Sequence, residues 1–495
     1  MTQQLAGRSE TPTPPENRST GLTAGLTLSA LTALVVGSMI GSGIFALPAN
    51  MAFSAAPGPL LIGWTVTGVG MLMLAFVFQN LAQRKPDVDG GVYGYARAGF
   101  GNYIGFSSAW GYWVSAWVGN VSYLVLLFST LGTFFPAFEG GNTVPAVIGA
   151  SIVLWLLHWL AISGVRSAAF VNTVVTVAKV VPIVTFVAVA LVGFKAGIFT
   201  TDFWGTNTQI DGAGLGSTMD QVKNMMLVTV WVFIGIEGAA VYSQQARNRR
   251  DVGRATILGF VGVLALLLMV NLLSYGLMTQ AQLAGLSDAS MADLLEDQVG
   301  GWGSTFISIG LVVSLLGALL SWVLLCVEIL RLPAQDHVMP GWLGTQNKHG
   351  SPANALWLTN ACVQALLLWT LKNGSTYLDL LYLATSLILL PYLWSAGYQV
   401  LLAARGETYT GAGRGKDLLV GLVATAYSVW LVYAGGWQYV LIAALFYLVG
   451  TVFYVWARRE ARQQLFTQLE WLAVGVVTVT SVVALYGVMA GWLEV

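Results

Sequence analysis

Charged residues are scarce in this chain. They make up 9% of its 495 residues, while 56% of the residues are hydrophobic and the net charge is zero. Soluble globular domains carry about 25% charged residues. A mostly water-exposed surface is therefore excluded, and the composition indicates an integral membrane protein. For a chain of this class we expect no nucleic-acid partner.

Cysteine and histidine are equally rare, with two and three copies. Cys326 and Cys362 both fall in hydrophobic segments, where they are expected to behave as small buried hydrophobes. His158, His337 and His349 are isolated from one another. We therefore expect no disulfide framework, no metal site and no cofactor. A His-Glu-x-x-His motif, paired aspartates and a serine with a nearby histidine are also missing from the hydrophobic segments, so the chain is not expected to be an enzyme.

A cleavable signal peptide is not evident either. Residues 1–20 are polar and rich in threonine and proline, and the hydrophobic segment that follows is too long for a signal sequence. We expect residues 1–20 to form a disordered cytoplasmic tail.

Long hydrophobic runs dominate the rest of the chain. A bilayer-spanning helix needs about 20 apolar residues, and thirteen segments qualify: 27–50, 58–81, 101–129, 143–162, 168–193, 222–243, 255–278, 303–331, 354–371, 376–402, 417–434, 437–457 and 469–490. The expected fold class is therefore an all-α polytopic membrane protein, in contact with the lipid bilayer on all sides.

The few charges are segregated between the loops, which predicts the orientation. With a cytoplasmic N-terminus, the outer loops receive only Lys195, Lys223 and Lys372. The inner loops receive sixteen basic residues: Arg84, Lys85, Arg97, Arg166, Arg247, Arg249, Arg250, Arg254, Arg331, Lys348, Arg405, Arg414, Lys416, Arg458, Arg459 and Arg462. Positive charge accumulates on the cytoplasmic side of membrane proteins. The pattern predicts a multi-pass protein of a bacterial cytoplasmic (inner) membrane, with its N-terminus in the cytoplasm.

The first hydrophobic segment contains residues that disfavour an unbroken helix. Gly41 and Gly43 flank Ser42, and Pro48 follows within two turns. A helix that is broken inside a membrane leaves free N–H and C=O groups at mid-bilayer. Such groups hold the polar ends of a solute in many transporters, so we expect a binding site here.

The sixth segment contains a second interruption, in which Glu237 lies between Gly235 and Gly238. An acidic residue at membrane depth is a candidate functional residue, although it could instead cap a helix break. The two interrupted segments begin two successive blocks of five spans. Paired interruptions at matching positions predict an inverted repeat with the binding site between its halves.

Other polar residues at membrane depth are weaker candidates. Lys179 lies about eleven residues inside the fifth segment, so it needs a partner or a role unless it reaches the surface. Tyr112 and Asn120 are eight residues apart in the third segment and share a helix face. In the tenth segment, Thr385 and Ser386 could face a wet cavity or bond to neighbouring helices.

Together these residues resemble the amino acid–polyamine–organocation transporters, and within them the basic amino acid/polyamine antiporters. The resemblance covers about residues 22–460. It rests on Gly41-Ser-Gly43, Tyr112-Trp-Val-Ser-Ala-Trp-Val-Gly-Asn120, Trp231 with Glu237, Trp322, and Pro391-Tyr392. It implies a LeuT-like 5+5 inverted repeat with broken first and sixth helices, which here would have twelve core helices and a thirteenth.

The resemblance also implies a role for each matching residue. Ser42 and Gly43 would hold the substrate carboxylate, and the carbonyl of Ile40 its α-amino group. Trp231 would stack on the substrate, Trp322 would pack on its aliphatic part, and Asn120 would contact its guanidinium end. Glu237 would act as a proton-sensitive gate, with Tyr112 and Tyr392 as further gating residues.

Two features differ from the arginine/agmatine antiporter of that family. Lys179 stands where that antiporter has a small residue, and it resembles a built-in cation that replaces the sodium ion of other relatives. The sequence Leu31–Pro48, with the thirteenth span, is similar to the branch that exchanges arginine for ornithine in the arginine deiminase pathway. The odd span count would place the C-terminus outside.

We therefore expect an antiporter that exchanges arginine for ornithine, with lysine as a further candidate substrate. Proton-coupled amino acid uptake and lysine/cadaverine exchange are alternatives. The expected organisation is a first repeat at 21–200, a second at 215–402 and C-terminal helices at 415–495. A homodimer is left open, and a channel or a nutrient sensor would need filter repeats or an output domain that the sequence does not contain.

Overall fold

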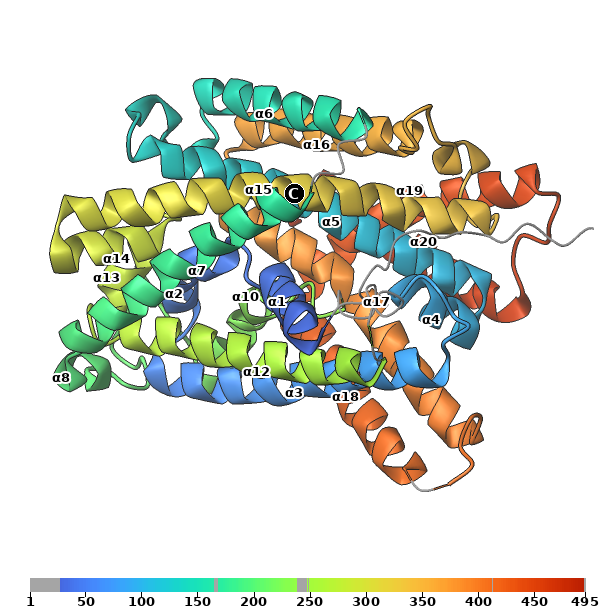
Figure 1. Ribbon diagram of the computed structural model, residues 1–495, viewed down its shortest axis with the longest axis horizontal. Coiled ribbons are helices and arrows are strands. Elements are labelled where there is room, and N and C mark those ends of the chain that lie inside the picture. The colour runs from blue at the N-terminus through green and yellow to red at the C-terminus, as the bar shows by residue number, and fades with distance from the viewer. Residues whose placement is uncertain (1–26, 164–167, 238–246, 248, 412, 494–495) are drawn as a thin grey trace, which may run out of the picture.

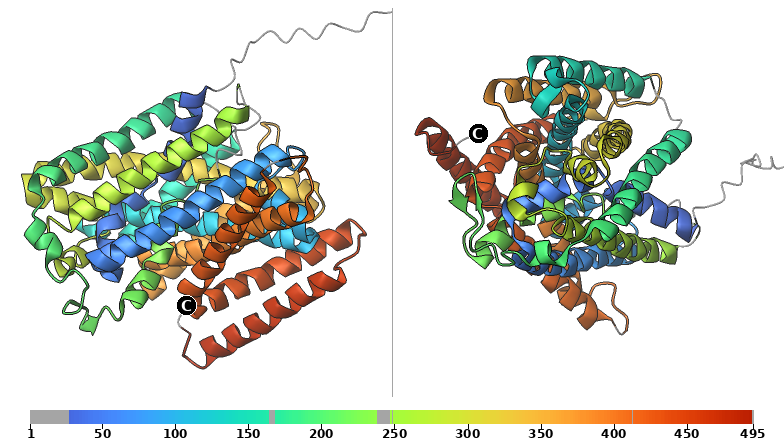
Figure 2. Two further views of the ribbon diagram at one scale, coloured as in Figure 1. Left: turned by 90° about the horizontal axis from the view of Figure 1, so that it is seen from below. Right: turned by 90° about the vertical axis from the view of Figure 1, so that its left-hand side faces the viewer.

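The computed structural model describes residues 27–163, 168–237, 247, 249–411 and 413–493. The described chain is a bundle of long helices, and Figure 2 shows most of them running side by side. Nine of the described helices are long and apolar enough to cross a membrane. They are α3 (Pro57–Arg84), α5 (Asn102–Gly132), α6 (Val144–Ile162), α12 (Arg249–Ser274), α15 (Gly301–Gln335), α17 (Tyr377–Arg405), α18 (Arg414–Ala434), α19 (Trp437–Glu460) and α20 (Gln468–Met489).

The described parts of the other four predicted spans also contain helices, but two of these spans are interrupted. They correspond to α1 (Leu28–Met39) with α2 (Gly43–Ser54), α7 (Ala168–Gly193), α9 (Thr218–Asn224) with α10 (Met226–Trp231), and α16 (Ala353–Asn373). A polytopic helical membrane protein is the fold class that these helices define.

The broken first span is confirmed. Helix α1 ends at Met39 and α2 begins at Gly43, with Ile40, Gly41 and Ser42 between them. In the sixth span, α10 ends at Trp231 and residues 232–237 form turns, with Gly235 at a positive φ of 107°. Only glycine adopts this conformation at low cost. Gly238, the second glycine of this predicted break, lies outside the described residues.

The interrupted helices lie in the middle of the bundle. Figure 1 shows α1, α2 and α10 between α15 and α12. Helix α5 is the most enclosed of the candidate spans, with 89% of its most apolar window buried. A side chain that faces lipid in the membrane is exposed in this structure, and few side chains of α5 are exposed. Helix α5 is therefore surrounded by protein.

Two polar segments contain short elements that the hydropathy pattern does not predict. Between the second and third predicted spans lies a helix, α4 (Val92–Phe100), which starts after Gly91 at a positive φ of 55°. In a predicted outer segment, β1 (Gln209–Ile210) and β2 (Ala213–Gly214) pair in an antiparallel hairpin. The other short elements are η1 (Pro136–Gly141), α8 (Ala196–Thr200), α13 (Gln280–Ala284), α14 (Ser290–Val299) and η3 (Gly341–Gly344).

Two acidic residues attach the C-terminal helices to the rest of the bundle. Asp417 at the start of α18 pairs with Arg84 of α3 at 2.7 Å. Glu470 at the start of α20 accepts a hydrogen bond from the backbone N–H of Tyr103, the second residue of α5. Figure 2 shows α19 and α20, in red, at the edge of the bundle. Most of α20 is exposed, as expected for a surface that faces lipid or another subunit.

Candidate functional site

A small closed cavity lies beside the two helix breaks. It is lined by Ser115, Ala116, Gly119 and Tyr123 of α5, by Trp231 and Ile234 at the sixth-span break, and by Trp322 of α15. Its volume is about 10 Å³, which is room for about one water molecule. An amino acid is far larger, so the walls must move apart before one can bind here.

The indole of Trp231 occupies a slot between two glycines. A Cβ atom on Gly43 would lie 2.9 Å from the Trp231 ring, and one on Gly119 would lie 3.1 Å from its opposite edge. The indole Nε1–H donates to the hydroxyl of Tyr377 at 3.2 Å, and Tyr123 packs edge-on at 5.7 Å. The ring that resemblance assigned to substrate stacking is therefore held rigidly at the cavity wall.

The first-span break offers unpaired polar groups. Ser42 is fully buried, and its Oγ has no hydrogen-bond partner among the described residues. It precedes the N-terminus of α2, where the first backbone N–H groups have no helical acceptor. The hydroxyl of Tyr123 packs against the break, since a Cβ atom built on Gly41 would lie 3.1 Å from it. Ile40 is buried in the same segment.

The three predicted gating residues form one cluster. Glu237 is 6% exposed, and its two carboxylate oxygens accept hydrogen bonds from Tyr112 at 2.7 Å and Tyr392 at 2.9 Å. The backbone N–H of Gly235 donates to the same carboxylate at 3.2 Å. The cluster joins α5, α17 and the sixth-span break. A carboxylate with three donors is held in place without a basic side chain.

Lys179 of α7 points to the first span. It is 7% exposed, and its ammonium group donates to the backbone carbonyl of Gly37 at 3.2 Å. Gly37 lies less than one turn before α1 ends at Met39. No carboxylate pairs with Lys179 in the described part of the chain. The lysine is therefore a buried cation that links α7 to the broken helix, and it does not snorkel to the surface.

Of the predicted site residues, only Trp231 and Trp322 line the cavity itself, and three of the others point elsewhere or lie in a helix interior. Asn120 directs its amide to Cys326 of α15, with Nδ2 3.8 Å from the sulfur. Ser386 donates to the carbonyl of Leu383 in its own helix at 2.8 Å. Thr385 is fully buried, and its hydroxyl has no partner among the described residues. It follows Ala384, whose carbonyl accepts a hydrogen bond from the cavity residue Ser115.

The cavity-lining residues Ser115, Ala116 and Ile234 were not anticipated from the sequence, and neither were Gly119, Tyr123 and Tyr377. Tyr377 begins α17 and holds the Trp231 indole, while Tyr123 and Gly119 bracket Asn120 on α5. Each would be ordinary in a packed helix. No pattern in the sequence links Gly119, Tyr123 or Tyr377 to Trp231, which is more than one hundred residues away.

Asp288 lies outside the membrane spans and has a carboxyl group whose pKa is shifted by its surroundings. It lies between α13 and α14 and accepts a hydrogen bond from Ser129 at 3.1 Å. Burial raises its pKa, with repulsion from Asp293 and Asp379 adding to the rise and the Ser129 hydrogen bond opposing it. The folded protein thus binds this proton more tightly than the unfolded chain. The stability that protonated Asp288 contributes is fully present below the ordinary pKa of the carboxyl group and is lost as the pH rises through the raised pKa.

We therefore expect Asp288→Asn to reduce the loss of thermal stability as the pH rises from about 4 to about 7. Asparagine fills the same space and does not titrate. The measurement is the melting temperature of the purified protein across this range, with the exposed Glu296→Gln as the matched control. Identical pH slopes for the Asp288 variant and the parent would contradict the assignment.

Taken together, the fold and site define a polytopic helical membrane protein with a closed polar site at two helix breaks. A family model described as amino acid permease matches residues 26–493. The chain belongs to this family, as the resemblance to amino acid–polyamine–organocation transporters predicted.

Characterised relatives cover nearly the whole chain. An arginine/ornithine antiporter of Pseudomonas aeruginosa is 56% identical over 476 residues, which is 94% of this chain and 98% of the relative. An L-lysine transport protein of Corynebacterium glutamicum is 46% identical over 481 residues, 94% of each chain. An arginine/agmatine antiporter of Chlamydia abortus is 40% identical over 437 residues, 88% of this chain and 90% of the relative.

Proposed function

We propose that this protein exchanges basic amino acids across the cytoplasmic membrane by alternating access, with arginine entering as ornithine leaves. The names of the relatives support transport of cationic amino acids, and two relatives of different identity are arginine antiporters. The single observation in the structure that carries the proposal is the cavity between Trp231 and Trp322, where the Trp231 indole packs against Gly43 of the first-span break.

The chemistry of this site fits a zwitterionic solute with a cationic side chain. The unpaired Ser42 hydroxyl and the N-terminus of α2 suit a carboxylate. Indole faces attract a guanidinium or ammonium group through the cation–π interaction. Glu237 supplies the counter-charge that a cation needs in a medium of low dielectric constant. On binding, the cationic end of the substrate would compete with the hydroxyls of Tyr112 and Tyr392 for the Glu237 carboxylate.

The architecture that suits this mechanism is the LeuT-like 5+5 inverted repeat. Its first half would span 21–200 and its second 215–402, and each would begin with an interrupted helix. Helices in 415–495 would form a scaffold, and the expected cytoplasmic tail at 1–20 lies outside the described residues. The segregation of basic residues supports a cytoplasmic N-terminus. The buried ammonium of Lys179 on the carbonyl of Gly37 would take the place of a coupling ion.

Exchange without an ion gradient is the expected property. Arginine and ornithine both carry a net charge of about +1 at neutral pH, so their exchange moves no net charge. In reconstituted liposomes, labelled arginine should enter vesicles loaded with ornithine and should stay near the protein-free background in empty vesicles. Equal uptake into both kinds of vesicle would overturn strict exchange.

The same vesicles separate the alternatives. Uptake into empty vesicles driven by an imposed pH gradient would indicate proton-coupled symport. Loading with lysine or cadaverine instead of ornithine tests exchange of lysine and its amine, a question that the lysine-transporting relative makes pertinent. Counterflow with this panel assigns the substrate pair directly.

A further inference from the structure

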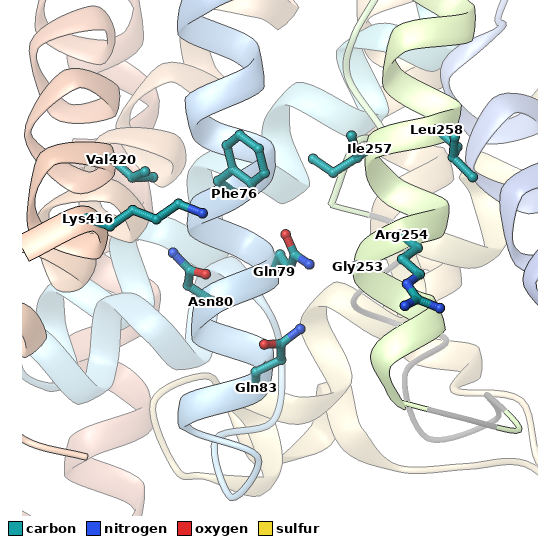
Figure 3. Close-up of a pocket in the computed structure, with 10 residues that line it drawn as sticks. All are labelled: Phe76, Gln79, Asn80, Gln83, Gly253, Arg254, Ile257, Leu258, Lys416 and Val420. Atoms are coloured by element: carbon teal, nitrogen blue, oxygen red, sulfur yellow. The ribbon is translucent and has the colours of Figure 1, made fainter. Parts of the chain in front are cut away.

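A second, larger cavity lies away from the transport site. Its volume is about 640 Å³, and it opens between α3, α12 and α18. Ten residues line it: Phe76, Gln79, Asn80, Gln83, Gly253, Arg254, Ile257, Leu258, Lys416 and Val420. None of them belongs to the transport site, so the cavity has no role in the mechanism proposed above. Figure 3 shows Lys416 and Arg254 on opposite sides of α3, with the side-chain amides between them.

The lining changes from polar to apolar along all three helices. On α3, Gln79 and Gln83 lie within the last turns before the helix ends at Arg84, whereas Phe76 lies deeper in the span. On α12, Arg254 lies near the start, and Ile257 and Leu258 one turn further in. Lys416 and Val420 repeat this order on α18. The polar part of the cavity is therefore at the membrane surface, and the apolar part reaches into the hydrocarbon region.

The mouth of the cavity faces lipid. Leu258, which lines it, is 54% exposed, and Val261, one turn further along α12, is 52% exposed. On α18, Leu419 is 62% exposed. Large apolar side chains with this exposure in a membrane protein contact acyl chains. A molecule that enters from the bilayer can thus reach the polar end without crossing water.

The polar end carries positive charge and open hydrogen-bond donors. No carboxylate lies within salt-bridge distance of the Lys416 ammonium in the described residues, and this group lies 5.8 Å from the centre of the Phe76 ring. Arg254 has a loose contact of 3.6 Å with Asp251. The nearby Asp417 is already neutralised by Arg84 at 2.7 Å and accepts from Asn80 at 3.2 Å.

Side-chain amides complete the polar end. Gln79 and Gln83 make no hydrogen bond with another described residue. Gly253 allows Gln79 to lie directly against α12, because a Cβ at this position would be 1.8 Å from the Gln79 amide nitrogen. Two cations and two amides from three helices therefore line one cavity at the membrane surface.

We propose that this cavity binds an anionic phospholipid, with its headgroup among Arg254, Lys416 and the side-chain amides of α3 and its acyl chains along Ile257 and Leu258. Basic cavities between membrane helices at the cytoplasmic surface bind anionic headgroups, and the predicted orientation places this end of α3, α12 and α18 there. A single small anion would fill only part of the volume, and a zwitterionic headgroup would bring its own cation against the two basic groups. The bound lipid would join α18 to the helices α3 and α12.

The test uses the purified full-length protein in phosphatidylcholine nanodiscs, with diphosphatidylglycerol as the probe. Lipid binding is measured by native mass spectrometry, and its effect by the rise in melting temperature. We expect Arg254→Ala with Lys416→Ala to weaken binding of the probe about 30-fold, from roughly fivefold for each basic residue removed. The matched control is Lys348→Ala with Arg459→Ala, which removes two exposed basic residues elsewhere.

Further arms keep the result interpretable. Arg254→Lys with Lys416→Arg keeps both charges and should bind the probe, which separates charge loss from misfolding. Gln79→Leu should weaken binding while leaving the charges in place. Equal loss of probe binding in the pocket and control double variants would overturn the site. Binding of added phosphatidylcholine as tight as that of diphosphatidylglycerol would overturn it too. Protection by inorganic phosphate alone at the same phosphate concentration would overturn its assignment to a lipid.

Discussion

Glu237→Gln is expected to lower the transport of arginine and ornithine about 100-fold or more, the effect of losing a buried counter-charge worth roughly 3 kcal/mol. The carboxylate is buried and accepts three hydrogen bonds, from Tyr112, Tyr392 and the Gly235 N–H. Glutamine has the same shape but carries no charge, and only one of its two terminal atoms accepts hydrogen bonds. Arginine exchange in ornithine-loaded vesicles measures the loss.

Ser42→Ala is the comparison for this prediction, because it removes one hydrogen-bonding group from the same site. Its cost should be about 1 kcal/mol, or less than tenfold in transport. A second readout isolates charge: citrulline has the shape of arginine without its cationic end. In the parent protein arginine should compete far better than citrulline, and in the Glu237→Gln variant this preference should largely vanish. Near-normal exchange by the glutamine variant would refute the role of Glu237.

The helices of the bundle could be predicted from the sequence because hydrocarbon allows few alternatives. A segment of about 20 apolar residues must satisfy its own backbone, so helix bounds follow from hydropathy. The break at Gly41 and Gly43 was equally accessible, since it violates that rule. The helix α4 was not predicted, because the glycines and charges before it indicate a turn and its amphipathic pattern is only nine residues long.

The site could be predicted only in part. Glu237 and Lys179 were identifiable because a charge at membrane depth is costly wherever the helices pack. Neutral polar residues carry no such signal. Asn120 was expected to contact the substrate and Ser386 to face a wet cavity or a neighbouring helix, yet in this conformation one faces Cys326 and the other bonds to its own helix. Their orientation depends on how α5, α15 and α17 rotate against each other, which the sequence pattern does not specify.

Packing partners of the site were harder still to predict. Tyr377 and Trp231 form a hydrogen bond across 146 positions of sequence, and Gly119 matters because an indole lies on it. A glycine in a membrane helix has many uses, and only the assembled bundle distinguishes a close helix contact from a slot for a side chain. The wall of the cavity therefore emerges from tertiary structure alone.

This slot leads to a second large effect. Gly43→Ala should reduce arginine exchange about tenfold or more, corresponding to roughly 1.4 kcal/mol or more. The new Cβ would lie 2.9 Å from Cδ1 and 3.1 Å from Nε1 of Trp231. Such contacts are too close, so the indole must move. Gly119 closes the other side of the slot, and Tyr377 holds the indole nitrogen, so the ring has little room to do so.

Gly37→Ala provides the matched control, since a Cβ there would meet nothing within 4 Å and the backbone carbonyl that accepts from Lys179 is retained. The same change in the same broken span should leave exchange close to the parent level, and alanine even favours helix α1. If alanine impaired exchange only by making the first span more rigid, Gly43→Ala and Gly37→Ala would lose activity to the same extent. If Gly43→Ala acts through the indole, the added substitution Trp231→Phe should relieve part of its defect, because a smaller ring leaves space for the methyl group. Full activity of Gly43→Ala alone would mean that the position of Trp231 does not limit transport, and its assignment as the substrate-stacking residue would fall with it.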